Sequence, residues 1–109
     1  MQKRRVEFGP DVKSLLRKLL EGYRIYFSYD KLNSEGRKVF EEMARMLVYE
    51  HPEYKPMVKR VRRNPTLDNV LKIARLVLGD GAEQIIHEVV QGPYYEYLYK
   101  KKEFNEQYY

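Results

Sequence analysis

Apolar residues recur every three or four positions along most of this chain, and this spacing limits the folds that it can adopt. The pattern is strongest between Leu67 and Leu78, where Val70, Leu71, Ala74 and Val77 fall on one face of a helix. The same spacing predicts helices over residues 10–21, 34–49, 53–63 and 82–90. We therefore predict an all-α protein, a compact bundle of five or six short helices with the 67–78 helix at the centre of its core.

Proline and glycine residues mark the ends of these predicted helices. Gly9-Pro10 starts the first, Pro52 ends the second, and Gly79 supplies a left-handed stop after Leu78. With 109 residues the chain is long enough for one domain with a single core. We predict a basic flexible arm over 1–8, a helical domain over 9–93 and a Tyr/Lys-rich helix or tail over 94–109.

The stretch Tyr23–Tyr29 is ambiguous because it is rich in residues that favour strands. A single strand without a partner is unstable, and no partner strand is evident elsewhere in the sequence. We therefore expect the first helix to continue through Gly22.

Five basic residues and no acidic residue occur between Lys55 and Pro65. They are Lys55, Lys59, Arg60, Arg62 and Arg63. In a helix, all of these except Arg60 share one face, and the apolar residues of the segment occupy another. A solvated helix usually alternates Glu with Lys, whereas here neighbouring charges repel one another unless a partner neutralises them. We predict that this face binds nucleic acid; a simple solvated face is the alternative.

Basic charge is concentrated in the first part of the chain. The net charge is +5, but residues 1–64 hold 16 Lys and Arg against 9 Asp and Glu, whereas residues 65–109 hold 5 against 7. Near the N-terminus, Lys3, Arg4 and Arg5 are expected to lie along a phosphate backbone, although a frayed terminus explains them equally well. Near the C-terminus, Lys100, Lys101 and Lys102 are expected to hold phosphates. Tyr95 and Tyr99 beside them are expected either to stack on bases or to form oligomer contacts.

Several classes of site are disfavoured by composition. The absence of Cys excludes disulfides, thiolate metal sites and a cysteine nucleophile, and two His residues make a zinc site improbable. We expect no metal and no cofactor. No apolar run is long enough to span a membrane and no signal peptide is visible, so we expect a location in the cytoplasm or within a virion. The many Lys, Arg, Glu and Tyr residues fit the bias of thermophile proteins.

The run from Asn64 to Gly79 begins with asparagine-proline and contains Leu71-Lys72-Ile73-Ala74. It resembles the helix after the recognition helix in Cro/lambda-repressor-like helix-turn-helix domains. Glu41-Glu42-Met43-Ala44 is similar to the first helix of that motif, so the resemblance covers about residues 40–79. It implies DNA binding, with groove-facing residues near Glu50–Lys55 and with Lys59–Arg63 at the backbone.

The sequence departs from that family at three points. Val48 stands where the turn usually has glycine, Pro56 falls inside the expected recognition helix, and the segment Gly22–Lys38 is longer than the family's link. An unrelated helical bundle therefore remains an alternative.

Other functions are also compatible with the sequence. Arg45 and His51 resemble the Arg-x(4–6)-His signature of HEPN-type ribonucleases, although His51 is more simply a residue at a helix end. We expect no catalysis. The main expectation is a protein that binds nucleic acid, DNA in preference to RNA, for example as a transcriptional regulator. The alternatives are a coat-like subunit of a nucleocapsid or ribonucleoprotein, which would form a homo-oligomer, and a module that binds an acidic protein.

Overall fold

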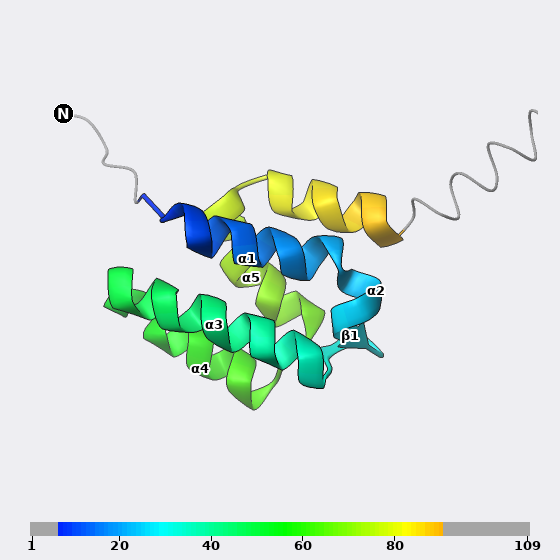
Figure 1. The fold of residues 1–109 in the computed structure, drawn as a ribbon, viewed down its shortest axis with the longest axis horizontal. Helices are drawn as coiled ribbons and strands as arrows, with labels where there is room; N and C mark the ends of the chain where they lie inside the picture. Colours follow the sequence, from blue (N-terminus) through cyan, green and yellow to red (C-terminus); the bar gives the residue numbers. More distant parts are fainter. Residues whose placement is uncertain (1–6, 91–109) are drawn as a thin grey trace, which may run out of the picture.

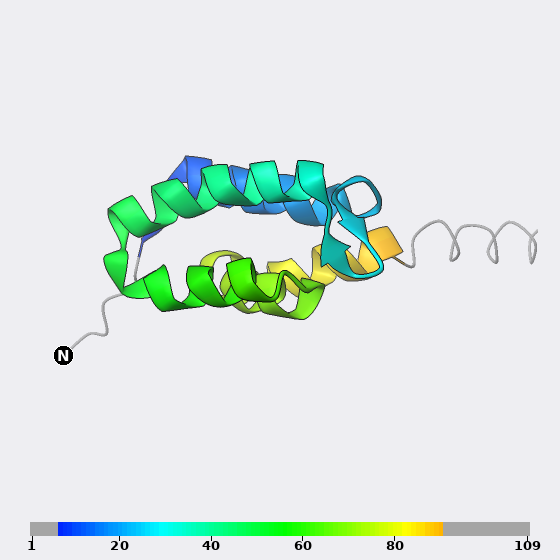
Figure 2. The same cartoon turned by 90° about the horizontal axis from the view of Figure 1, so that it is seen from below.

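The helices form two layers. The computed structural model describes residues 7–90, in which α1 (Pro10–Glu21) and α3 (Ser34–Glu50) lie antiparallel in one layer (Figures 1 and 2). The short helix η1 (Pro52–Tyr54) leads into the second layer, which contains α4 (Lys55–Arg63), α5 (Leu67–Leu78) and a helix over residues 81–90. The prediction of an all-α bundle is confirmed.

The core lies between the two layers and is built from the apolar stripes that the spacing predicts. Leu16 and Leu19 of α1, Phe40 and Met43 of α3, and Ile73 of α5 are each at most 2% exposed. α5 packs against both α1 and α4, as expected for a central element. It is not buried on every side, since Leu76 is 48% exposed.

The helix ends follow local rules. α3 is capped by Asn33, whose side chain accepts a hydrogen bond of 2.8 Å from the Gly36 N–H, and Ser34 is its first residue. Thr66 caps α5, and Gly79 follows it with a φ of 68°. Pro56 lies in the first turn of α4, where its missing N–H costs no helical hydrogen bond.

The prediction of helix for Tyr23–Tyr29 holds for Tyr23–Tyr26 only, because the chain turns into a hairpin at Phe27. α1 ends at Glu21, a single turn, α2 (Tyr23–Tyr26), follows, and β1 (Phe27–Ser28) then pairs antiparallel with β2 (Lys31–Leu32). The partner strand lies only a few residues further along the chain. Two buried side chains, Phe27 and Leu32, stabilise the hairpin from the core side.

The hairpin is also attached to the segment between α4 and α5. The Leu32 N–H donates to the Pro65 carbonyl at 2.9 Å, and the Leu67 N–H donates to the Asp30 carbonyl at 2.8 Å. The Tyr23 hydroxyl donates to the Asp30 carboxylate, and this bond, together with burial, raises the pKa of Tyr23 above its ordinary value. The hairpin therefore connects the two layers at the end of the molecule opposite η1 (Figure 2).

Candidate nucleic-acid interface

α4 has a buried side and a basic side. Val58 and Val61 are at most 1% exposed. The solvent side carries a group of cations that we call the basic ridge: Lys55, Lys59, Arg60 and Arg63. Lys55, Lys59 and Arg63 follow one another at intervals of four residues, so they form a single stripe along the helix. In residues 7–90, none of the four ridge residues forms an ion pair with a carboxylate.

Arg62 was predicted to contact phosphate, but its side chain is paired with Glu41. Its Nε lies 2.9 Å from Glu41 Oε2 and its Nη2 lies 2.8 Å from Glu41 Oε1, a bidentate pair between α4 and α3. Arg62 follows the buried Val58 by one helical turn, so it lies at the edge of α4 that faces α3. The hydrogen bond to Glu41 raises the pKa of Arg62 above its ordinary value. Arg62 therefore connects two helices instead of extending the ridge.

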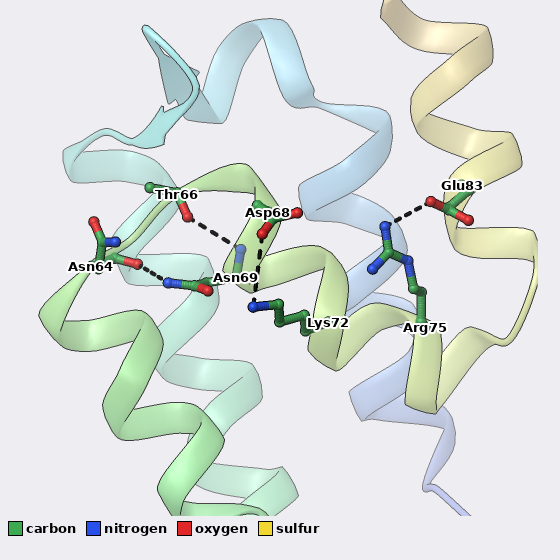
Figure 3. Close-up of polar contacts among 7 residues, drawn as sticks. All are labelled: Asn64, Thr66, Asp68, Asn69, Lys72, Arg75 and Glu83. Atoms are coloured by element: carbon green, nitrogen blue, oxygen red, sulfur yellow. Dashed lines mark hydrogen bonds and ion pairs between the residues drawn. The ribbon is translucent and has the colours of Figure 1, made fainter.

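The cations of α5 are also occupied. Lys72 Nζ lies 3.8 Å from Asp68 Oδ2, and Arg75 Nη2 lies 2.7 Å from Glu83 Oε2 in the next helix (Figure 3). The second layer therefore places paired cations on α5 and unpaired cations on α4. Other cations in residues 7–90, such as Lys13, Arg17 and Lys18 of α1, also form no ion pair. The ridge differs from an ordinary solvated face, on which acidic and basic side chains alternate, because α4 contains no acidic residue.

Polar contacts also fix the end of α4 relative to the start of α5. The buried Asn69 side chain donates to the Asn64 carbonyl at 2.8 Å, and the Asn69 N–H donates to Thr66 Oγ1 at 3.2 Å (Figure 3). Because Asn64 directly follows Arg63, these bonds hold the C-terminal end of the ridge in place.

The helix dipole explains part of the ridge but not all of it. Arg60 and Arg63 lie in the last turn of α4, where cations stabilise the negative end of a helix. Lys55 lies at the first position, next to the positive end, where a cation is unfavourable. Helix stability alone therefore does not explain why position 55 is a lysine.

The dimensions of the ridge suit a phosphate backbone. From Lys55 to Arg63 the helix rises about 12 Å, at about 1.5 Å per residue. One DNA strand places a phosphate about every 3.4 Å along the duplex axis, so the ridge spans roughly three to four phosphates. Four cations over that length match the number of charges they would meet.

The described chain starts beside the N-terminal end of the ridge. The Phe8 ring packs against His51 and Tyr54 at centroid distances of 5.0 and 5.7 Å, and His51 Nε2 lies 2.7 Å from the Glu7 carbonyl oxygen. Tyr54 immediately precedes α4. Lys3, Arg4 and Arg5 lie outside the described residues.

His51 holds the start of the described chain against the end of α3 through its contacts with Glu7 and Phe8. Besides the contact with Glu7, its Nδ1 lies 3.9 Å from Glu53 Oε2. Arg45 lies exposed on α3, and within residues 7–90 it forms no hydrogen bond with His51. The ribonuclease alternative gains no support from this arrangement.

The helix-turn-helix resemblance assigns α3 and α4 to the two helices of the motif. Such helices usually cross at about 90–120°, whereas α3 and α4 run in opposite directions, one in each layer (Figures 1 and 2). The resemblance stays a prediction.

The remaining site predictions, Tyr95, Tyr99, Lys100, Lys101 and Lys102, lie outside residues 7–90. Sequence reasoning overlooked the solvent side of α1, which carries Lys13, Arg17 and Lys18. Their spacing of four and five residues was the available signal, but Asp11 and Glu21 on the same helix made it less conspicuous.

No family model, curated protein or solved structure matches this chain. Residues 7–90 contain no group of three or more His, Asp or Glu side chains that could hold a metal ion. In the same range, no helix is long and apolar enough to cross a membrane.

Proposed function

We propose that the protein binds nucleic acid, with duplex DNA as the principal ligand, through phosphate contacts made by the basic ridge. One observation carries the proposal: α4 presents four exposed cations without an acidic residue in the same helix, and none of the four forms an ion pair among the described residues. An external polyanion supplies the missing negative charge. Lys3, Arg4 and Arg5, which precede the described residues, would add further phosphate contacts.

The side chains of the ridge are better suited to phosphate contacts than to contacts that distinguish one base from another. Arg guanidinium groups bind phosphate oxygens bidentately, and Lys ammonium groups act as point charges. Contacts of this kind position a protein on the backbone and carry no direct sequence information. Binding is therefore expected to be largely independent of sequence.

The salt dependence of binding tests the proposal. Each neutralised phosphate contributes about −0.9 to the slope of log K against log salt for duplex DNA and about −0.7 for a single strand. We expect the four ridge cations to give a slope of about −3.6 on duplex DNA. Contacts from Lys3, Arg4 and Arg5 would make the slope steeper. Fluorescence anisotropy of a labelled duplex from 50 to 200 mM salt measures it. A slope near zero, or no binding at 50 mM, contradicts the proposal.

A variant that breaks the Arg62–Glu41 pair should strengthen binding to DNA, and this provides a second test. Replacing Glu41 by Gln removes the carboxylate and releases Arg62, so we expect tighter binding and a slope steeper by about 0.9. The cost in folding stability should be below about 1 kcal/mol, because the pair is half-exposed. The anisotropy titration above and urea unfolding measure the two quantities.

Glu42→Gln is the matched control. Glu42 is the exposed neighbour of Glu41 on α3 and forms no ion pair among the described residues, so its replacement makes the same charge change without freeing Arg62. Equal slopes for the two variants would show that net charge, and not the release of Arg62, controls binding.

A further inference from the structure

Tyr29 occupies a backbone position that suits a tyrosine poorly. Tyr29 and Asp30 form the two-residue turn of the β1–β2 hairpin and have φ values of 53° and 61°. Positive φ at both central residues is the geometry of a type I′ turn, in which Asn-Gly and Asp-Gly are preferred. A bulky residue in this region is uncommon and raises the free energy of the folded state.

Packing does not explain why a tyrosine is present. The Tyr29 side chain is 100% exposed, whereas Tyr23 and Tyr26 pack against the core and Tyr54 packs against Phe8. Tyr49 is also exposed, at 89%, but it lies within the regular helix α3. Tyr29 therefore combines an unfavourable backbone with full exposure of its ring.

The hairpin places Tyr29 near the C-terminal end of the ridge. Lys31 forms a β-bridge with Thr66, and Thr66 follows Arg63 by three residues. The Arg63 and Thr66 Cα atoms are therefore at most about 11 Å apart. The exposed cation Lys31 lies between Tyr29 and Arg63 along this route, so an aromatic ring and two cations follow one another along this end of the molecule.

A hollow of about 280 Å³ lies beside the Tyr29 ring. Leu67 and Leu71 supply apolar surface, and the remaining lining residues are Asp30, Lys31, Thr66 and Asp68. The hollow is smaller than typical sites for drug-sized ligands, which suits a single planar group. Its two carboxylates disfavour a phosphate inside it, but carboxylates accept hydrogen bonds from the exocyclic amino groups of bases.

We propose that Tyr29 is a stacking platform for an unpaired base of a nucleic acid whose backbone continues over Lys31 and Arg63. The inference rests on the proposed function and adds a ligand class to it, namely nucleic acid in which a single-stranded segment adjoins a duplex. Stacking on an exposed aromatic ring is independent of sequence, because every base has a π-face. Exposure of Tyr29 in the free protein leaves its ring available for that contact.

The test compares Tyr29→Gly with Tyr29→Phe on a blunt duplex and on the same duplex with a single-stranded overhang. We expect Tyr29→Gly to weaken binding of the overhang ligand by roughly 5- to 150-fold, the range for one stacked base. Binding of the blunt duplex should not change, and Tyr29→Phe should bind both ligands like the original protein. The melting temperature of Tyr29→Gly should not fall, because glycine adopts positive φ without strain.

Tyr49→Ala is the control for loss of an exposed tyrosine, and it should leave the affinities for both ligands unchanged. If Tyr29→Gly binds the overhang ligand as tightly as the original protein does, or loses equal affinity for both ligands, the stacking site is wrong while the ridge proposal stands. If the unaltered protein binds neither ligand at 50 mM salt, the proposed function itself fails.

Discussion

Replacing Gly36 by alanine is expected to destabilise the protein by about 3 kcal/mol, at the upper end of the range for overpacking. A Cβ at Gly36 would overlap the carbonyl oxygen of Tyr26 and would lie 2.9 Å from Leu32 Cδ2. The Tyr26 carbonyl cannot move easily, because it accepts a hydrogen bond of 2.9 Å from the Asn33 N–H. Urea unfolding followed by circular dichroism measures the change.

Gly81→Ala is the matched control. Gly81 lies in the helix over residues 81–90, and a Cβ there would have no heavy atom within 4 Å. We expect this variant to be as stable as the original protein or more stable by about 0.4–1 kcal/mol, because alanine restricts the unfolded chain. Equal stability of the two variants would mean that α3 does not pack closely against the α2–hairpin segment.

The helices could be predicted from sequence because their determinants are local. The three-and-four spacing from Leu67 to Leu78 and the glycine at 79 are sufficient to define α5, and Gly9-Pro10 marks the start of α1 at the observed residue. These signals act within one or two helical turns. They do not depend on how the helices pack.

The hairpin was missed because its determinants are partly distant. Its strands are two residues long and its turn contains no glycine or asparagine, so the local signal is weak. Much of its support comes from Pro65, Thr66 and Leu67, more than thirty residues away in the sequence. Only the packing of the two layers brings these segments together.

The candidate site also depends partly on local sequence and partly on distant residues. The exposure of Lys55, Lys59 and Arg63 follows from helical spacing, which the sequence provides directly. The neutralisation of Arg62 depends on Glu41, which lies 21 residues earlier and becomes a neighbour only because the chain reverses direction between α3 and α4. Identical residue types in one short segment therefore have different roles, and tertiary structure assigns them.

The triple replacement of Lys55, Lys59 and Arg63 by alanine is expected to remove most of the binding to duplex DNA. Three phosphate contacts contribute about 2.7 to the salt slope, so the slope should become shallower by that amount. At an exposed surface each contact stabilises by about 0.5–1 kcal/mol, so the affinity at 50 mM salt should fall roughly 10- to 150-fold. Fluorescence anisotropy measures both, and the fold should persist because all three side chains are exposed.

The matched control is the triple replacement of Lys13, Arg17 and Lys18 by alanine. It also removes two lysines and one arginine from the exposed side of a helix, but from α1 in the other layer. If the ridge holds the backbone, this variant should lose less than a third of the slope that the α4 variant loses, because long-range attraction is screened beyond about 10 Å at 0.1 M salt. Equal losses would show that the net charge of the whole protein attracts nucleic acid and that α4 has no special role.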